Sequence, residues 1–88
     1  MIHTTRAEMV ANILEVSVSL REQVSTGDVL LLLESMKMEI PVLAEVTGSV
    51  VEIAVSKGDV VQEGDPLVMI DTSLAPKRED QKQRSPKS

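Results

Sequence analysis

Residues 34–42 read Glu34-Ser35-Met36-Lys37-Met38-Glu39-Ile40-Pro41-Val42. Apolar segments flank this stretch, so we expect a chain reversal with Met36 and Lys37 near its tip. Turns normally use Gly, Asn, Asp or Pro, because these residues tolerate the backbone angles that a reversal needs. Broken local rules are typical of functional sites. A lysine held between two flexible methionine side chains suits covalent attachment of a mobile group better than catalysis by the lysine itself.

The sequence contains an internal repeat, in which residues 2–34 align with residues 39–71 without a gap. Nine aligned pairs are identical, and the pairs Gly27-Asp28 and Gly64-Asp65 fall in register. Two copies are too few for a solenoid, so we expect one compact domain with a pseudo-two-fold axis. Because Lys37 falls at the join of the copies, it should lie at the opposite end of the domain from both chain ends.

Both copies of the repeat favour β-strands. Residues 13–18 and 50–55 are rich in Val and Ile, with polar positions that indicate one solvated face. The apolar run 29–33 could be helical on propensity alone, but it is short and follows a Gly-Asp pair, which favours a strand. Three glycines that precede an aspartate predict turns: Gly27, Gly58 and Gly64. We therefore predict an all-β fold of eight short strands with almost no helix.

The length of 88 residues allows one domain, which we expect over residues 1–74. Residues 75–88 are rich in Pro, Lys, Arg, Gln and Ser without apolar periodicity, which predicts a disordered basic tail. No cysteine is present, so no disulfide stabilises the core. No apolar run approaches the roughly 20 residues of a membrane helix, and the first residues do not resemble a signal peptide. We expect a cytoplasmic protein that does not act at a membrane.

Charge and composition argue against several functions. Residues 1–75 hold twelve acidic and four basic side chains, and the chain has no Phe, Trp or Tyr. An acidic body without aromatic platforms is a poor nucleic-acid binder. The single histidine, His3, has no neighbouring metal ligands in the sequence. The sequence also lacks a nucleophile–base pair of the kind that would indicate an enzyme. The net charge of −5 is compatible with a monomer.

The chemistry of an exposed lysine also favours modification by another enzyme. A free lysine has a pKa of about 10.4, so it is charged and a poor nucleophile at neutral pH. Schiff-base lysines need burial or a neighbouring cation, and a solvated turn tip offers neither. A partner enzyme would therefore have to present an activated acyl group to Lys37. The attached arm would then be concentrated at every active site within its reach.

The segment Glu34-Ser35-Met36-Lys37-Met38-Glu39 resembles the biotin attachment motif of biotinyl domains, whose core is Ala/Ser-Met-Lys-Met. The similarity covers about residues 7–71, including 46–51 and 55–67. Related lipoyl domains usually carry Asp-Lys-Ala, so the motif favours biotin. The resemblance implies a flattened antiparallel β-barrel or sandwich of two four-stranded sheets with pseudo-two-fold symmetry, and a biotinylated lysine on a hairpin.

The same resemblance implies the roles of individual residues and partners. Lys37 would be the biotinyl-lysine, Met36 and Met38 would contact a biotin protein ligase, and Glu34 and Glu39 would belong to the surface that the ligase meets. The domain would carry carboxyl groups between biotin carboxylase and carboxyltransferase subunits that act on an acyl-CoA or a 2-oxo acid. It would contribute no catalytic residue. The isolated position of His3 in the sequence separately predicts that the domain binds no metal.

The chain departs from the family pattern at a few positions. The first copy has Ala11 and Arg21 where the second has Gly48 and Gly58. The thumb insertion and the Ala/Pro-rich extension of some acetyl-CoA carboxylase carriers are absent, which favours a small stand-alone protein or the carrier of another carboxylase. Three alternatives stay open: a lipoylated carrier, an unmodified adaptor, and a core-filling role for the methionines.

Overall fold

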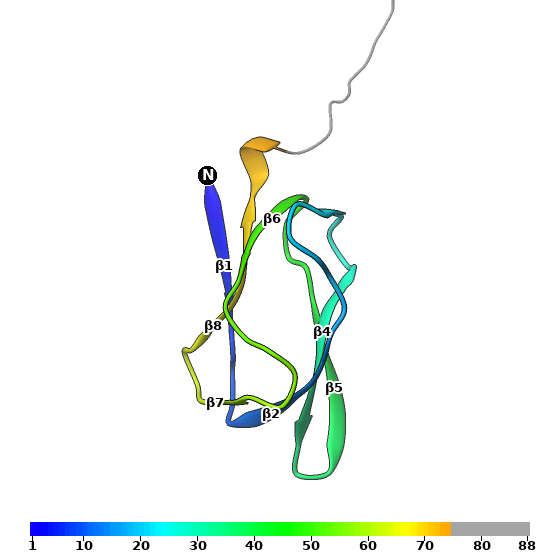
Figure 1. Ribbon diagram of the computed structural model, residues 1–88, viewed down its shortest axis with the longest axis vertical. Helices are drawn as coiled ribbons and strands as arrows, with labels where there is room; N and C mark the ends of the chain where they lie inside the picture. Colours follow the sequence, from blue (N-terminus) through cyan, green and yellow to red (C-terminus); the bar gives the residue numbers. More distant parts are fainter. Residues whose placement is uncertain (75–88) are drawn as a thin grey trace, which may run out of the picture.

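A computed structural model describes residues 1–74, and the expected basic tail, residues 75–88, lies outside the described residues. The described chain contains eight strands and one 3₁₀ helix (Figure 1). In chain order these are β1 (Ile2–Arg6), β2 (Ala11–Val16), β3 (Gln23–Val24), β4 (Val29–Ser35), β5 (Met38–Leu43), β6 (Gly48–Ile53), β7 (Val60–Val61), β8 (Pro66–Asp71) and η1 (Thr72–Leu74). The prediction of eight short strands with almost no helix is confirmed.

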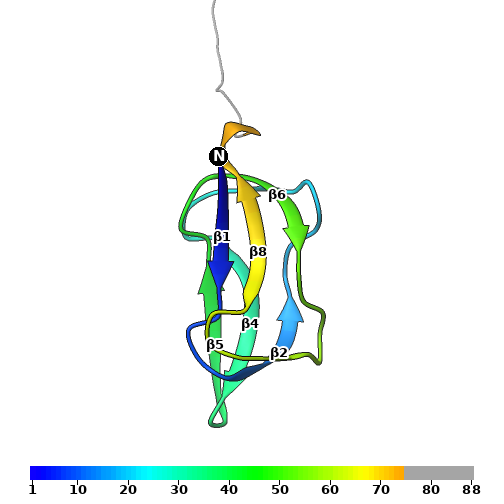
Figure 2. The ribbon, with the colours of Figure 1, turned by 90° about the vertical axis from the view of Figure 1, so that its left-hand side faces the viewer.

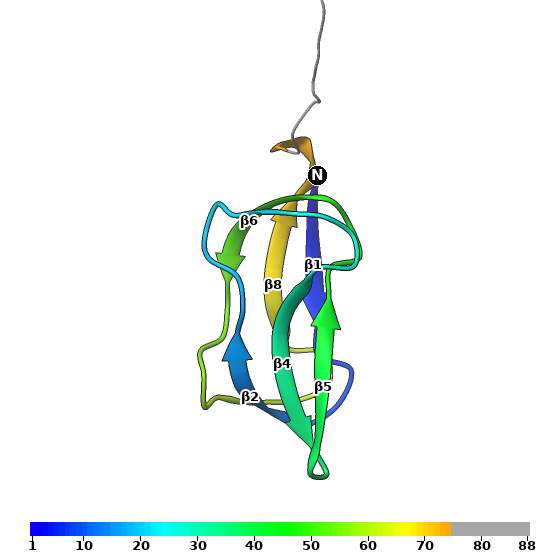
Figure 3. The same cartoon turned by 90° about the vertical axis from the view of Figure 1, so that its right-hand side faces the viewer.

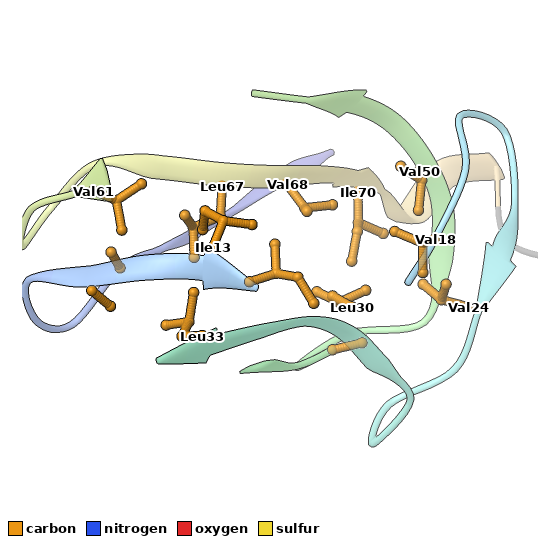
Figure 4. Close-up of a cluster of buried hydrophobic side chains, with 14 residues drawn as sticks. Ile13, Val18, Val24, Leu30, Leu33, Val50, Val61, Leu67, Val68 and Ile70 are labelled. Carbon is orange, nitrogen blue, oxygen red and sulfur yellow. The ribbon is translucent and has the colours of Figure 1, made fainter. Parts of the chain in front are cut away.

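The strands form two four-stranded antiparallel sheets that pack face to face (Figures 2 and 3). One sheet has the order β1-β8-β6-β3 and the other β5-β4-β2-β7. Apolar side chains from both sheets meet between them, as Figure 4 shows. The most deeply buried large side chains are Ile13, Leu30, Leu31, Val50, Leu67, Val68 and Ile70. The flattened sandwich predicted from the sequence is therefore the observed architecture.

The 37-residue repeat is visible in the structure. Strands β2 and β6 have boundaries that differ by 37 positions, as do β3 and β7. The same shift turns the strand order β1-β8-β6-β3 into β5-β4-β2-β7, so each sheet is the image of the other. The register irregularities correspond as well, since the one between Ile13 and Glu15 matches the one between Val50 and Glu52. The expected pseudo-two-fold relation is confirmed.

Two strand boundaries differ from the prediction. β2 and β6 begin and end two residues earlier than the predicted segments 13–18 and 50–55. Ala11 already pairs with Val61, whereas Val18 lies after the end of β2 and is still only 8% exposed. The connection that leaves the sheet therefore places an apolar side chain in the core. The apolar pattern of a sequence indicates which residues are buried, not which residues pair in a sheet. Here the buried residues extend beyond the end of the hydrogen-bonded strand.

The predicted turn glycines lie in turns with a left-handed backbone. Gly27, Gly58 and Gly64 have φ values of 96°, 94° and 91°, a region that glycine enters without steric cost. The following aspartates accept backbone hydrogen bonds from the residue three positions earlier, at 2.8–2.9 Å. Arg21, which aligns with Gly58, keeps the left-handed conformation at φ 71°. The first copy thus retains the turn geometry of the second at a position without glycine.

Residue 1 and η1 lie at one end of the sandwich, and the β4–β5 hairpin lies at the other (Figures 1 and 3). The backbone amide of Thr72 donates a 2.9 Å hydrogen bond to the carbonyl of Met1, so the N-terminus and η1 meet at one end. The hairpin projects beyond the sandwich at the other end. The predicted separation of Lys37 from both ends is confirmed as far as residue 74. Within residues 1–74, no helix reaches the length and apolarity needed to cross a membrane.

Candidate functional site

The β4–β5 hairpin closes with a two-residue loop. Ser35 pairs with Met38 across the two strands, which leaves Met36 and Lys37 as the only loop residues. Both have positive φ, 53° for Met36 and 65° for Lys37. Two successive left-handed residues define a type I′ turn, the connection whose twist matches that of two antiparallel strands. The hairpin geometry is thus the tightest that a sheet allows, and Lys37 occupies its tip.

The residues at this turn are not those that the turn prefers. Type I′ loops strongly favour Asn-Gly or Asp-Gly, because a left-handed residue with a β-carbon costs roughly 1–2 kcal/mol. Met36 and Lys37 carry that cost, and the Met36 side chain remains 92% exposed. Neither burial nor turn preference therefore explains these residues. Strained, exposed residues of this kind are found at functional sites.

The base of the hairpin is held firmly by the sandwich. Leu31 and Leu33 of β4 are 0% and 3% exposed, respectively, and Pro41 of β5 lies on the outer edge of its sheet, where a missing N–H donor is tolerated. The hydroxyl of Ser35 donates a 3.2 Å hydrogen bond to the carbonyl of Val10 in the β1–β2 connection. A rigid platform therefore presents an exposed tip.

The electrostatics of the tip leave the lysine available. Glu34 and Glu39 face each other across the hairpin, and like charges directly opposite destabilise a strand pair. In residues 1–74, Lys37 has no ion pair or hydrogen bond with either carboxylate. Met38 is 62% exposed beside them. The tip is an exposed lysine between two methionines, with a pair of acidic side chains behind it.

The arrangement suits attachment of a group to the lysine. Within the described part of the chain, no three His, Cys, Asp or Glu side chains gather closely enough to hold a metal ion. His3 instead lies 3.0 Å from the carboxylate of Glu45 through Nε2. Lys37 and Lys57 are the only lysines of residues 1–74, and only Lys37 lies at a hairpin tip. An exposed primary amine on a rigid hairpin can accept an acyl group delivered by another protein.

The structure brings five of the predicted site residues together and separates the rest. Glu34, Met36, Lys37, Met38 and Glu39 share the hairpin, whereas the three turn glycines lie in other connections. Sequence reasoning missed two features of the site: the bond from Ser35 to Val10 and the exposure of Val60, which is 65%. Only the strand register places Val60 near the hairpin, because β7 pairs with β2 and β2 with β4.

A fold of two repeat-related four-stranded sheets with a lysine at a projecting hairpin defines a class of protein, the attachment domains that carry a cofactor on a lysine. The family model described as "Biotin-requiring enzyme" (Biotin_lipoyl) matches residues 4–70. The chain therefore belongs to the Biotin_lipoyl family. Biotin, the cofactor expected from the motif, agrees with this description and with the names of the relatives below.

Two mycobacterial relatives share a 44-residue segment with the chain. Identity is 66% with the "Biotinylated protein TB7.3 homolog" of Mycobacterium leprae and 61% with the "Biotinylated protein TB7.3" of Mycobacterium tuberculosis. In each case the alignment covers 50% of this chain and 62% of the relative. The similarity therefore spans less than two thirds of the length of these relatives.

Solved structures of large carboxylases contain a domain of the same shape. A single-chain, multi-domain long-chain acyl-CoA carboxylase superposes with a TM-score of 0.75 at 26% identity, over 92% of this chain and 8% of that one. The urea carboxylase of Kluyveromyces lactis gives a TM-score of 0.76 at 27% identity, over 81% and 6%. The domain fold seen here is thus similar to a small part of two carboxylases with different substrates.

The described residues fit covalently attached biotin. Attachment through an amide needs a primary amine that another enzyme can reach, and Lys37 offers one at an exposed tip without a competing ion pair. The hairpin is held at its base and free at its end, so an arm on Lys37 would move without disturbing the sandwich.

Proposed function

We propose that this protein is a biotin carrier whose Lys37 is biotinylated by a biotin protein ligase. The observation that carries the proposal is the type I′ hairpin, which holds Lys37 in a left-handed conformation at the end of the domain away from residues 1 and 74. The family match and the names of the relatives support biotin as the attached group. The proposal includes a single attachment domain over residues 1–74.

Each hairpin residue has a role in attachment under this proposal. The two-residue loop places the exposed Lys37 at the tip of the hairpin, so that its Nζ can enter the active site of a ligase. Met36 and Met38 supply flexible apolar contacts to the ligase. Glu34 and Glu39 supply a negative patch for a basic surface. The Nζ then forms an amide with the activated carboxyl carbon, a proton is lost, and the activating group leaves with its electron pair.

The domain contributes position and no catalytic group. Bound biotin supplies the ability to carry a carboxyl group, and the hairpin concentrates it at any active site that the arm reaches. Biotin carboxylase and carboxyltransferase subunits of an acyl-CoA carboxylase type are the proposed partners, supported by the carboxylase neighbours. We place this carrier in the cytoplasm, in fatty acid metabolism, as a monomer when isolated.

The intact mass of the protein from cells with an active biotin ligase tests the proposal. We expect the mass of one added biotinyl group in the wild type and none in Lys37→Arg, which keeps the charge but removes the primary amine. Lys57→Arg is the matched control, because it changes the other lysine of residues 1–74 and should leave modification intact.

Two results would redirect the assignment. A mass that corresponds to lipoate would place the protein among the acyl carriers of oxidative complexes. An unmodified mass, in cells where other proteins are biotinylated, would indicate an adaptor that keeps the hairpin without its cofactor.

A further inference from the structure

A shallow groove lies beside the hairpin, on the outer face of the sheet that contains β4 and β5. Its volume is about 490 Å³, which falls within the range of small-molecule sites, about 300–1,000 Å³. Its lining includes Met9, Val10, Asn12, Glu34, Met36 and Val60. We refer to it as the hairpin groove. Because Met36 is one of its walls, the groove begins one residue from the attachment lysine.

The hairpin groove has a polar centre between apolar walls. Asn12 pairs with Glu34 on one side and with Val60 on the other, so the three side chains form a row across β4, β2 and β7. Neighbouring strands are about 4.8 Å apart. Within residues 1–74 the Asn12 amide and the Glu34 carboxylate have no hydrogen-bond partner. The row thus offers free donors and acceptors beside exposed apolar surface.

The repeat shows that the fold does not require the apolar walls contributed by Val10 and Val60. The positions related to these two by the 37-residue shift hold Thr47 and Gln23, whereas Met36 lies at the join of the copies and has no counterpart in a hairpin. The side chains of Val10, Met36 and Val60 are 63%, 92% and 65% exposed, respectively. The same strand backbone therefore accepts polar residues at the symmetry-related end of the sandwich. Apolar side chains at the end that carries Lys37, where the fold tolerates polar ones, indicate a ligand there.

We propose that the hairpin groove is a resting site for the ring system of the biotin carried by Lys37, an inference that depends on the proposed function. Biotin has an apolar thioether ring fused to a ureido ring, which has two N–H donors and one carbonyl acceptor. The Glu34 carboxylate accepts a hydrogen bond from a ureido N–H, and the Asn12 amide donates one to the ureido carbonyl. Val10, Met36 and Val60 cover the thioether ring.

The tether makes a weak site effective. Three residues of a strand span roughly 10 Å, and a lysine side chain extended by a valeryl chain is longer, so the ring can fold back from Lys37 to the row at Glu34. A short flexible tether holds the ring at an effective concentration on the order of millimolar. Modest apolar burial is then enough to populate the docked arm. Docking also covers the exposed walls while the arm is not engaged by a partner enzyme.

Methyl-resolved NMR spectra of the biotinylated and unmodified full-length protein test the proposal. We expect biotinylation to shift the methyl signals of Met9, Val10 and Val60, which line the groove, and nuclear Overhauser contacts to join them to the protons of the biotin ring. The double variant Val10→Thr/Val60→Gln places the residues of the symmetry-related positions in the groove. It should abolish most of the shift and the ring contacts of the Met9 methyl group, which the variant keeps, without changing the extent of biotinylation. Leu20→Gln is the matched control, because it removes an exposed apolar side chain in the β2–β3 connection and should change neither.

Two results would overturn the inference: shifts confined to residues 36–38, or ring contacts that persist in the double variant. The intact mass is measured on the same samples. A missing biotinyl group would contradict the proposed function, whereas a biotinylated protein with a free arm would contradict only the resting site.

Discussion

At the scale of single residues, the hairpin tip shows a conflict between residue type and backbone conformation. Met36 and Lys37 occupy left-handed positions that Asn and Gly would fill at lower cost. The motif alone predicted an unusual turn at these residues, and the structure adds the reason, which is positive φ at both. The side chains at the tip are therefore not those that the backbone conformation prefers.

The substitution Met36→Asn tests this conflict. Asn enters the left-handed region more readily than Met, so we expect the free energy of unfolding to rise by about 1 kcal/mol, measured by urea denaturation. Biotinylation of Lys37 by the ligase should become slower, because an apolar contact is lost. Met38→Asn is the control: Met38 lies in β5 and its φ is not positive, so no stabilisation is expected. An unchanged stability of Met36→Asn would show that the tip is not strained.

Thr5 carries a second local cost. It is 6% exposed, and its Oγ1 has no hydrogen-bond partner within the described residues. The other copy of the repeat has Val42 at this position. An unsatisfied buried hydroxyl costs about 1–3 kcal/mol, so Thr5→Val should raise the free energy of unfolding by about 1 kcal/mol in urea denaturation. Thr4→Val, at a half-buried neighbouring position, should raise the free energy of unfolding less. Equal increases in the two variants would argue that the unsatisfied hydroxyl of Thr5 is not the cause.

At the scale of elements, the repeat predicted more than the strand propensities did. It correctly implied eight strands, their symmetry and the position of the hairpin, because two copies of one pattern must satisfy the same backbone pairing. The ends of the strands could not be predicted from the repeat. Val18 looked like a strand residue because it is apolar, but it is buried in the connection after β2. The hairpin groove also could not be predicted, because Asn12, Glu34 and Val60 are brought together only by pairing across three strands.

The start of β6 gives a prediction at this scale. A β-carbon on Gly48 would lie 2.6 Å from the carbonyl oxygen of Asp71 and 2.8 Å from Cγ2 of Ile70. The close packing of β6 against β8 therefore depends on glycine. We expect Gly48→Ala to lower the free energy of unfolding by about 1–3 kcal/mol in thermal or urea denaturation.

The substitution Gly27→Ala distinguishes the cost of backbone strain from the cost of the steric clash expected in Gly48→Ala. A β-carbon on Gly27 would meet nothing within 4 Å, although φ is 96°. Its cost should be near 1 kcal/mol and smaller than that of Gly48→Ala. The reverse order would mean that β6 and β8 adjust to the added methyl group.

At the scale of the whole molecule, one end of the sandwich is closed by contacts of residue 1, and the other end carries the hairpin. β1 pairs with β8, and the N-terminal amine lies 3.4 Å from Oδ1 of Asp71. The hairpin is at the opposite end (Figure 2). Changes at the closed end should therefore alter stability without altering modification of Lys37. This separation allows a measurement of the fold that is independent of the site.

The pH dependence of unfolding gives that measurement. Hydrogen bonds from the Ser73 hydroxyl, at 2.6 Å, and from the Ser73 amide, at 2.9 Å, hold the pKa of Asp71 below its ordinary value of 3.8, and the N-terminal amine lowers it further. Because the folded pKa is the lower one, this stabilisation is complete above 3.8 and is lost as the pH falls through the folded pKa. Asp71→Asn should therefore unfold at lower urea than the wild type well above pH 3.8, and the difference should shrink well below it. Ser73→Ala should move the carboxyl titration of Asp71, followed by NMR, upward toward 3.8. A difference between Asp71→Asn and the wild type that stays constant with pH would show that the ionised carboxylate does not hold this end of the sandwich closed.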